Sequence, residues 1–250
     1  MREKLLRLAG GFLRLGFLAE KRCPNCGQAR QDPAGRRASL CPDCLAESAS
    51  PQGAPCPGCG AWPPVAQTSA LLCGDCRRAP RPWGRLVAFG PYGGRLRDAI
   101  LAYKFESRLD LGRQLQEYAL SAFERGAAVC PELAACEVIV PVPLHSRRLA
   151  WRGFNQSREL ARLLSARRGV PIVQEALSRV RRTVPQMKLG REARVENIRG
   201  AFMARRDLVD GRSILLVDDI MTTGATLEEC ARTMLTAGAA RVDVLVLARA

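Results

Sequence analysis

The segment ILLVDDIMTTGATL, residues 214–227, joins three features in direct succession. Its apolar run, 214–217, is typical of a buried strand, and residues 225–239 have the pattern of a helix. Between them stand two carboxylates, Asp218 and Asp219, and a Thr-Thr-Gly loop. Backbone N–H groups at a helix start favour an anion, whereas the two aspartates repel one. The segment therefore indicates a ligand that offers both hydroxyl groups and a phosphate.

A phosphorylated sugar satisfies both halves of this segment. Carboxylates accept hydrogen bonds from hydroxyls and bind Mg²⁺, so Asp218 and Asp219 suit the 2- and 3-hydroxyls of ribose 5-phosphate. The phosphate suits the Thr-Thr-Gly loop, where Gly224 lets the backbone approach closely. Thr226 and Glu229 fit a capping box for the helix that follows. The loop has no lysine after its glycine, so it is not a Walker A motif.

Eight of the eleven cysteines form four C-x-x-C pairs. Two pairs read C-P-x-C-G, a turn that aims backbone N–H groups at thiolate sulfur, and four such thiolates form a tetrahedral zinc site. The spacing repeats after 32 or 33 residues, which favours two consecutive zinc ribbons and leaves a cross-braced pairing open. A disulfide-rich secreted module would need an export signal, which we do not find. The expected zinc ligands are Cys23, Cys26, Cys41 and Cys44 for one site and Cys56, Cys59, Cys73 and Cys76 for the other.

Apolar runs alternate with helical patterns in the rest of the chain. This alternation predicts an α/β fold, a parallel sheet with helices on both faces, in which ligands bind beyond the carboxyl ends of the strands. The expected strands are 137–143, 170–177, 212–219 and 241–249. The expected helices are 155–169, with Asn155 as its N-cap and Gly169 as its end, and 225–239, with two more in 98–126. Residues 191–204 are expected to form a strand after a mobile loop.

The charge is strongly positive, with a net of +15 carried by 35 Arg and 4 Lys. Residues 145–212, here named the basic segment, hold 17 basic and 6 acidic residues, a net of +11. Such a segment attracts phosphate-rich ligands or nucleic acid, or forms a solvated surface. No run of about 18 apolar residues exists, so no membrane span is expected. Residues 1–22 have helical periodicity and no cleavage site, so we expect a helix that packs on its own protein or lies on a membrane surface.

Four segments carry a resemblance to known proteins. Residues 214–227 resemble the 5-phosphoribosyl 1-pyrophosphate (PRPP) motif of type I phosphoribosyltransferases. The segments YKFESRLDLG (103–112), PVPLHSRRLAWRGFNQSRELA (141–161) and RRTVPQMKLGREARVENIRGAF (181–202) are similar to the ComF family, competence-type proteins of this fold with an N-terminal zinc ribbon. The resemblance covers nearly the whole chain.

The resemblance implies an architecture, a ligand and a cellular role. The architecture is an N-terminal helix (1–22), a double zinc ribbon (23–82) and a type I phosphoribosyltransferase-like domain (83–250). The ligand is PRPP with Mg²⁺, and the metal of the ribbons is structural Zn²⁺. The role is cytoplasmic and linked to natural transformation, with single-stranded DNA and a competence helicase as partners.

Residue roles follow from the same resemblance. The aspartate pair binds the ribose hydroxyls, the Thr-Gly loop binds the 5-phosphate, and the loop after strand 137–143 holds pyrophosphate. A mobile loop with basic side chains closes over PRPP, and Lys104 is either a further ligand or a solvated helix lysine. The catalytic candidates are Asp218, Asp219, Lys188 and Arg191; the PRPP-binding candidates are Asp218, Asp219, Thr222, Thr223, Gly224, Ala225, Thr226, Arg147, Arg148, Arg152 and Lys104.

Three classes of function remain open from the sequence. One is a phosphoribosyltransferase, with nucleobase salvage as one variant. The second is a catalytically inactive sensor of PRPP or nucleotides. The third is a single-stranded DNA adaptor that uses the ribbons and the basic segment.

Overall fold

The computed structural model describes residues 22–23, 25–29, 41, 43–44, 53–63, 69–106, 108–145, 149–150, 152–181, 183 and 191–250, with the backbone alone at 191, 192, 194 and 195. The N-terminal helix expected over residues 1–22 falls outside this part of the chain, apart from Arg22.

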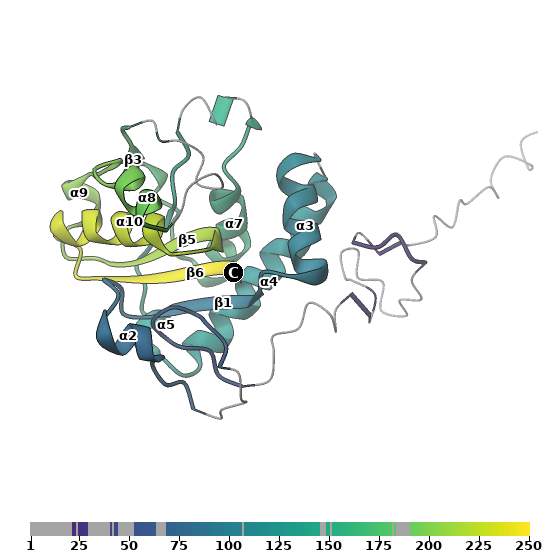
Figure 1. Ribbon diagram of the computed structural model, residues 1–250. Coiled ribbons are helices and arrows are strands. Elements are labelled where there is room, and N and C mark those ends of the chain that lie inside the picture. The colour runs from purple at the N-terminus through teal and green to yellow at the C-terminus, as the bar shows by residue number, and fades with distance from the viewer. Residues whose placement is uncertain are drawn as a thin grey trace, which may run out of the picture.

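A four-stranded parallel sheet lies at the centre of the structure, in the strand order β1-β6-β5-β2 (Figure 1). Apolar strands that are buried on both faces favour this parallel arrangement, as the sequence predicts. The strand β1 was not among those expected from the sequence. The strands are β1 (Leu86–Pro91), β2 (Val138–Pro141), β5 (Ser213–Met221) and β6 (Arg241–Arg249).

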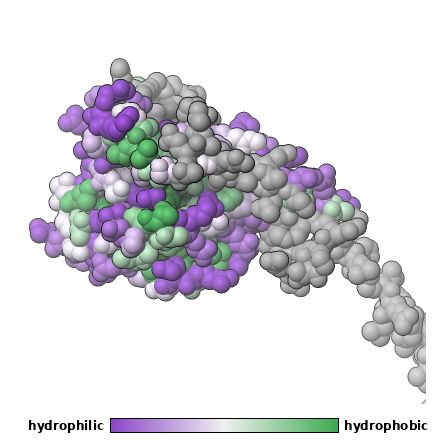
Figure 2. Space-filling model, turned by 90° about the horizontal axis from the view of Figure 1, so that it is seen from below, coloured by the Kyte–Doolittle hydropathy of each residue, from purple (hydrophilic) through white to green (hydrophobic). Residues whose placement is uncertain are grey.

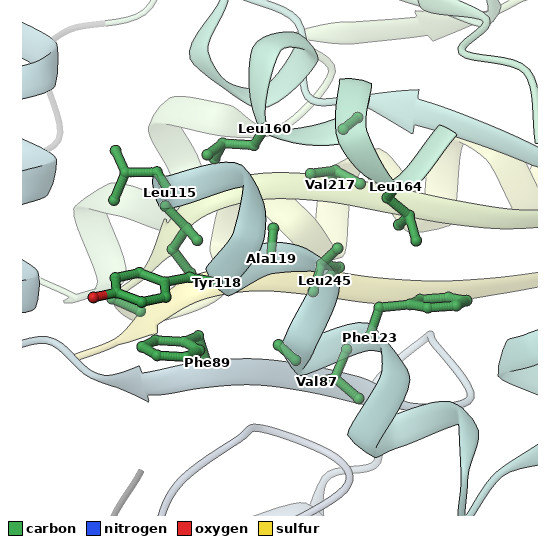
Figure 3. Packing of buried hydrophobic residues seen from close by; sticks show 14 of the residues in the cluster. Val87, Phe89, Leu115, Tyr118, Ala119, Phe123, Leu160, Leu164, Val217 and Leu245 are labelled. Carbon is green, nitrogen blue, oxygen red and sulfur yellow. The ribbon is translucent and has the colours of Figure 1, made fainter. Parts of the chain in front are cut away.

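One face of the sheet is covered by α4 (Gly112–Ala127) and α7 (Gln156–Arg168). Side chains of the two helices meet alternate residues of the strands, such as Val217 and Leu245, because successive strand residues point to opposite faces (Figure 3). The opposite face packs against α10 (Ala225–Thr236).

The helix α7 begins and ends at the residues that the sequence predicts. Asn155 is its N-cap and accepts hydrogen bonds from the backbone N–H groups of Ser157 and Arg158. Gly169 ends the helix with a φ of 69°, the left-handed conformation that glycine adopts without strain.

Two expected strands are wrong. Residues 170–176 make a single bridge to the main sheet, between Ile172 and Ile139, because Pro171 has no N–H for a longer ladder and the chain then turns into η2 (Gln174–Ala176); of the expected range only Leu177 belongs to a strand. Residues 191–204 begin with α8 (Arg191–Ile198), and only β4 (Phe202–Ala204) is extended. β4 pairs in an antiparallel manner with β3 (Leu177–Arg179), apart from the main sheet.

Shorter elements complete the described chain. The two helices expected in 98–126 are confirmed as α3 (Gly94–Phe105) and α4. Figure 1 shows α3 beside the end of the sheet where β6 ends. These elements are α2 (Gly74–Arg78), α3 (Gly94–Phe105), η1 (Leu109–Leu111), α5 (Pro131–Ala134) and α9 (Arg206–Val209).

The surface is mixed in polarity. On the face seen in Figure 2, several apolar patches lie among hydrophilic residues. Every helix in the described part of the chain is too short or too polar to cross a bilayer.

Candidate functional site

The two aspartates lie where β5 extends beyond the end of its neighbour β2. The last pair between these strands is Pro141 with Val217, while β5 continues to Met221 beside β6. The strand therefore ends two residues later than the sequence predicts, and it carries Asp218 and Asp219 past the end of β2. Both carboxylates lie at the carboxyl end of the sheet, as expected for a ligand site in an α/β fold.

The Asp218 carboxylate is held by two donors. The hydroxyl of Ser157, in the first turn of α7, donates to Asp218 Oδ1 at 2.9 Å. The backbone N–H of Asp219 donates to the same oxygen at 2.9 Å. Removal of this carboxyl group from water, together with the neighbouring charge of Asp219, raises the pKa of Asp218 to about 7. Its proton affinity is therefore matched to neutral pH.

A lysine far away in sequence neutralises the second aspartate. Lys104, in the last turn of α3, places its Nζ 2.6 Å from Asp219 Oδ2. Both side chains are largely buried, at 12% and 14% exposure. Of the two explanations that the sequence left open for Lys104, a solvated helix lysine is wrong.

The Thr-Gly loop joins β5 to α10 and has the geometry of an anion site. Gly224 is the N-cap of α10 and has a φ of 89°, which disfavours any residue with a side chain. The hydroxyl of Thr223 accepts a hydrogen bond from the Ala225 N–H at 3.4 Å, while Thr222 is exposed. The N–H groups of the first turn of a helix lack partners within the helix, so a turn of this kind can receive an anion.

The expected capping box is wrong. The helix begins at Ala225, so Thr226 lies inside its first turn and is not the N-cap. The carboxylate of Glu229 instead accepts a hydrogen bond from the Gly200 N–H at 2.6 Å. Glu229 thus ties α10 to the connection between α8 and β4.

Gly224 is also required for packing behind the loop. A Cβ atom at this position would lie 2.7 Å from Met221 Cε, 3.4 Å from Arg81 Nη1 and 3.7 Å from the Trp83 ring. The missing side chain therefore faces the protein interior, and not only the expected ligand phosphate.

The structure describes one of the expected pyrophosphate-binding arginines. Arg152 lies 5.2 Å above the ring of Phe105, the residue that follows Lys104. Asn155 donates from its Nδ2 to the Val142 carbonyl at 3.1 Å and so holds the start of the loop after β2. The remaining candidates, Arg147, Arg148, Lys188 and the side chain of Arg191, lie outside the described residues.

Three residues around the site were not predicted from the sequence: Ser157, Arg81, and Glu229 in its observed role. Arg81 pairs with Glu228 in the first turn of α10. Ser157 had one usable signal, because the predicted N-cap at Asn155 places it in a first turn. No sequence signal connects Arg81 to α10.

Two groups of four cysteines have the geometry of metal centres. The first cluster is Cys23, Cys26, Cys41 and Cys44, and the second cluster is Cys56, Cys59, Cys73 and Cys76; within each, the sulfur atoms lie within 4.8 Å of one another. This grouping confirms the consecutive pairing and rejects the cross-braced one.

The sulfur distances suit tetrahedral zinc. The Sγ atoms of Cys26 and Cys41 are 3.6 Å apart, and those of Cys59 and Cys73 are 3.7 Å apart. A tetrahedron with zinc–sulfur bonds of about 2.3 Å has edges of about 3.8 Å. The backbone N–H of Cys73 lies 3.3 Å from the Cys56 sulfur, as expected of a donor to a thiolate. Both clusters therefore fit structural zinc.

The second cluster is fastened to the sheet. The Trp83 Nε1 donates to the Gly58 carbonyl at 2.7 Å, and the Leu86 N–H donates to the Pro57 carbonyl at 2.8 Å. Arg249, the last residue of β6, donates from its Nε to the Cys59 carbonyl at 2.8 Å. These contacts join the second cluster to strands β1 and β6.

Comparisons with known proteins agree with this architecture. The phosphoribosyl transferase domain model matches residues 153–250. The DNA utilization protein YhgH of Escherichia coli K12 is 38% identical over 78% of this chain and 83% of its own length. Competence protein F of Haemophilus influenzae is 32% identical over 78% of this chain and 85% of its own, and competence protein ComFC of Bacillus subtilis is 27% identical over 84% of each. Among solved structures, the match to glutamine PRPP amidotransferase of B. subtilis covers 58% of this chain and 30% of that one, at 21% identity and a TM-score of 0.39.

Proposed function

The chain belongs to the ComF family, and from this premise we propose that it binds PRPP with Mg²⁺ at the carboxyl end of β5. One observation carries the proposal: the acid pair Asp218 and Asp219, near the end of β5, is followed two residues later by a glycine-capped loop at the N-terminus of α10. The first half accepts hydrogen bonds from hydroxyls and the second half receives a phosphate. PRPP offers both groups on one ribose.

The charges around the site suit the other end of the ligand. PRPP carries its pyrophosphate on C1. Lys104 contacts Asp219 of the acid pair, and Arg152 lies over the ring of Phe105, the residue after Lys104. When the C1–oxygen bond breaks, negative charge gathers on the leaving pyrophosphate and positive charge on the sugar. Lys104 and Arg152 stabilise the first charge, and Asp218 and Asp219 stabilise the second.

Mg²⁺ fits the chemistry of this donor set, because the hard carboxylate oxygens of Asp218 and Asp219 stand beside the expected position of the ribose hydroxyls. When bound, the ion neutralises pyrophosphate charge. The protein contributes orientation: Ser157 fixes the Asp218 carboxylate, and Lys104 fixes that of Asp219.

We further propose that phosphoribosyl binding serves the handling of single-stranded DNA. The relatives named DNA utilization protein and competence protein support this role. The basic segment supports it through charge, because phosphate contacts dominate sequence-independent DNA binding. Two cysteine clusters that fit zinc complete the proposal, and the reduced cysteines that such sites require suit a reducing compartment such as the cytoplasm.

Calorimetry on the full chain tests PRPP binding. PRPP should bind to the wild type in the presence of Mg²⁺, and inorganic phosphate should compete with it. Asp219→Asn keeps the shape of the side chain but removes a charged acceptor, so affinity should fall about tenfold to a hundredfold. Asp110→Asn is the matched control, since Asp110 is an exposed acid that pairs with Arg108 on η1; its affinity should equal that of the wild type. Absence of PRPP binding to the wild type would refute the proposal.

A further inference from the structure

Residues 79–83 follow the second cluster and are here named the tail. Arg81 and Trp83 of this tail lie against the inner side of the Thr-Gly loop. We propose that Arg81 and Trp83 are positioning residues of the phosphoribosyl site, which hold the loop in its binding shape only while the second cluster is metal-bound. The inference rests on the proposed function and adds a second module to the site. It makes the affinity for phosphate depend on metal at one cysteine cluster and not at the other.

The contacts with the loop are close and mostly buried. Arg81 pairs with the carboxylate of Glu228, and the two side chains are 15% and 26% exposed. The Arg81 guanidinium and the Trp83 ring both border the space where a Gly224 side chain would lie. Trp83 itself is 5% exposed and packs in the same apolar cluster as Met221 and Leu227. Loop and tail therefore share one packed interface.

The contacts with the second cluster are equally direct. Trp83 donates to the carbonyl of Gly58, which stands between two of the cysteines. A Cβ atom on Gly58 would lie 3.0 Å from the Cys76 sulfur, so this turn is closely packed. Arg81 is flanked by Pro80 and Pro82, whose rings fix the backbone φ. A short, stiff tail thus connects the metal site to the loop.

Metal loss has a defined consequence in this arrangement. A cysteine module with so little core is held together by its ion. If the tail is released, Glu228 loses its cation and leaves an uncompensated carboxylate in the first turn of α10. That charge repels an anion at the adjacent loop. The Arg81 Nε is buried without a hydrogen-bond partner among the described residues, so its position depends on the surrounding packing.

The first cluster supplies a matched control. Its described side-chain hydrogen bond to the main domain runs from Asn25 to the Arg95 carbonyl in α3, at 3.4 Å. Cys26 and Cys73 are the partly exposed cysteines of their clusters. The variants Cys26→Ser and Cys73→Ser therefore remove equivalent ligands from the two centres.

The experiment compares these two variants of the full chain. Each should lose one of two zinc equivalents by elemental analysis. Calorimetry with PRPP and Mg²⁺ should show a loss of about tenfold or more for Cys73→Ser and wild-type affinity for Cys26→Ser. Hydrogen exchange should accelerate at residues 221–228 in Cys73→Ser alone.

A second pair of variants separates the charge effect from a failure to fold. Arg81→Met should retain both zinc ions and weaken PRPP binding, whereas Arg81→Met combined with Glu228→Gln should recover affinity. A purely structural role of Arg81 would not produce this recovery.

The outcomes are distinct. If the wild type binds PRPP and both Cys73→Ser and Arg81→Met bind it equally well, the inference is overturned and the proposed function stands. If the wild type does not bind PRPP, the proposed function fails, and unchanged exchange at residues 221–228 in Cys73→Ser overturns the structural coupling as well.

Discussion

Replacement of Asp218 by asparagine should stabilise the unliganded protein above neutral pH. In the folded chain this carboxyl group is largely removed from water and stands beside Asp219, which raises its pKa to about 7. Ionisation at neutral pH therefore costs free energy in the folded chain that it does not cost in the unfolded one. The amide of the Asp218→Asn variant would accept and donate hydrogen bonds in nearly the same shape without an ionisable group.

The size and direction of the effect follow from linkage. The ordinary carboxyl pKa is 3.8, and its difference from about 7 corresponds to about 4 kcal/mol, at about 1.4 kcal/mol for each pKa unit. The residue keeps some contact with solvent, so screening reduces this to about 2 kcal/mol. Because the folded-state pKa is the higher one, stability falls as pH rises from about 4 to about 7 and stays low above it. Asp218→Asn should equal the wild type near pH 4 and exceed it by about 2 kcal/mol at pH 8.

Denaturant unfolding at pH 4.5, 6 and 8, without added Mg²⁺ or PRPP, measures the difference between the two proteins. Effects of pH on the cysteine clusters are common to both and cancel. Asp110→Asn is the control, since Arg108 lowers the pKa of Asp110 and the variant should gain nothing at pH 8. A difference between wild type and Asp218→Asn that stays constant across the pH range would refute the reasoning. So would destabilisation by Asp218→Asn at pH 8.

Two further predictions address the loop and the basic segment. Gly224→Ala should destabilise the protein by about 1–3 kcal/mol, because φ at this position is 89° and the new Cβ would meet Met221 Cε. Thermal unfolding measures the loss, and Gly153→Ala, also at positive φ but in open space, should cost less. Single-stranded DNA should bind with an affinity that falls steeply between low and high salt and depends little on sequence, as fluorescence anisotropy can show; binding that ignores salt would count against the basic segment.

Local signals account for the parts of the fold that the sequence predicts correctly. The apolar run of β5, the N-cap Asn155 and the terminal Gly169 act within a few residues of the elements they define. β3 and β4 gave no such signal, because strands of three residues show no period and their pairing is a tertiary event.

The same distinction between local signals and tertiary contacts applies to the residues of the site. The order of acids, threonines and glycine predicts which residues meet at the end of β5, because they are neighbours in sequence. Lys104, Ser157 and Arg81 reach that point from three other segments, and chain spacing says nothing about such contacts. Glu229 shows the reverse case: its spacing from Thr226 fits a cap, but a tertiary hydrogen bond to Gly200 takes its carboxylate instead.

The conflict between acids and anion loop is resolved before any ligand arrives. Lys104 neutralises Asp219 on the sugar side of the proposed site, and Arg81 neutralises Glu228 behind the phosphate side. Both pairs are largely buried, and a partly buried charge that loses its partner is destabilising. The fold can therefore place Asp219 and Glu228 within one short segment of the proposed anion site because each of the two has a cation from a distant segment. A sugar phosphate that enters such a site meets fixed hydroxyl acceptors and a loop whose positive field is not cancelled by the acids beside it.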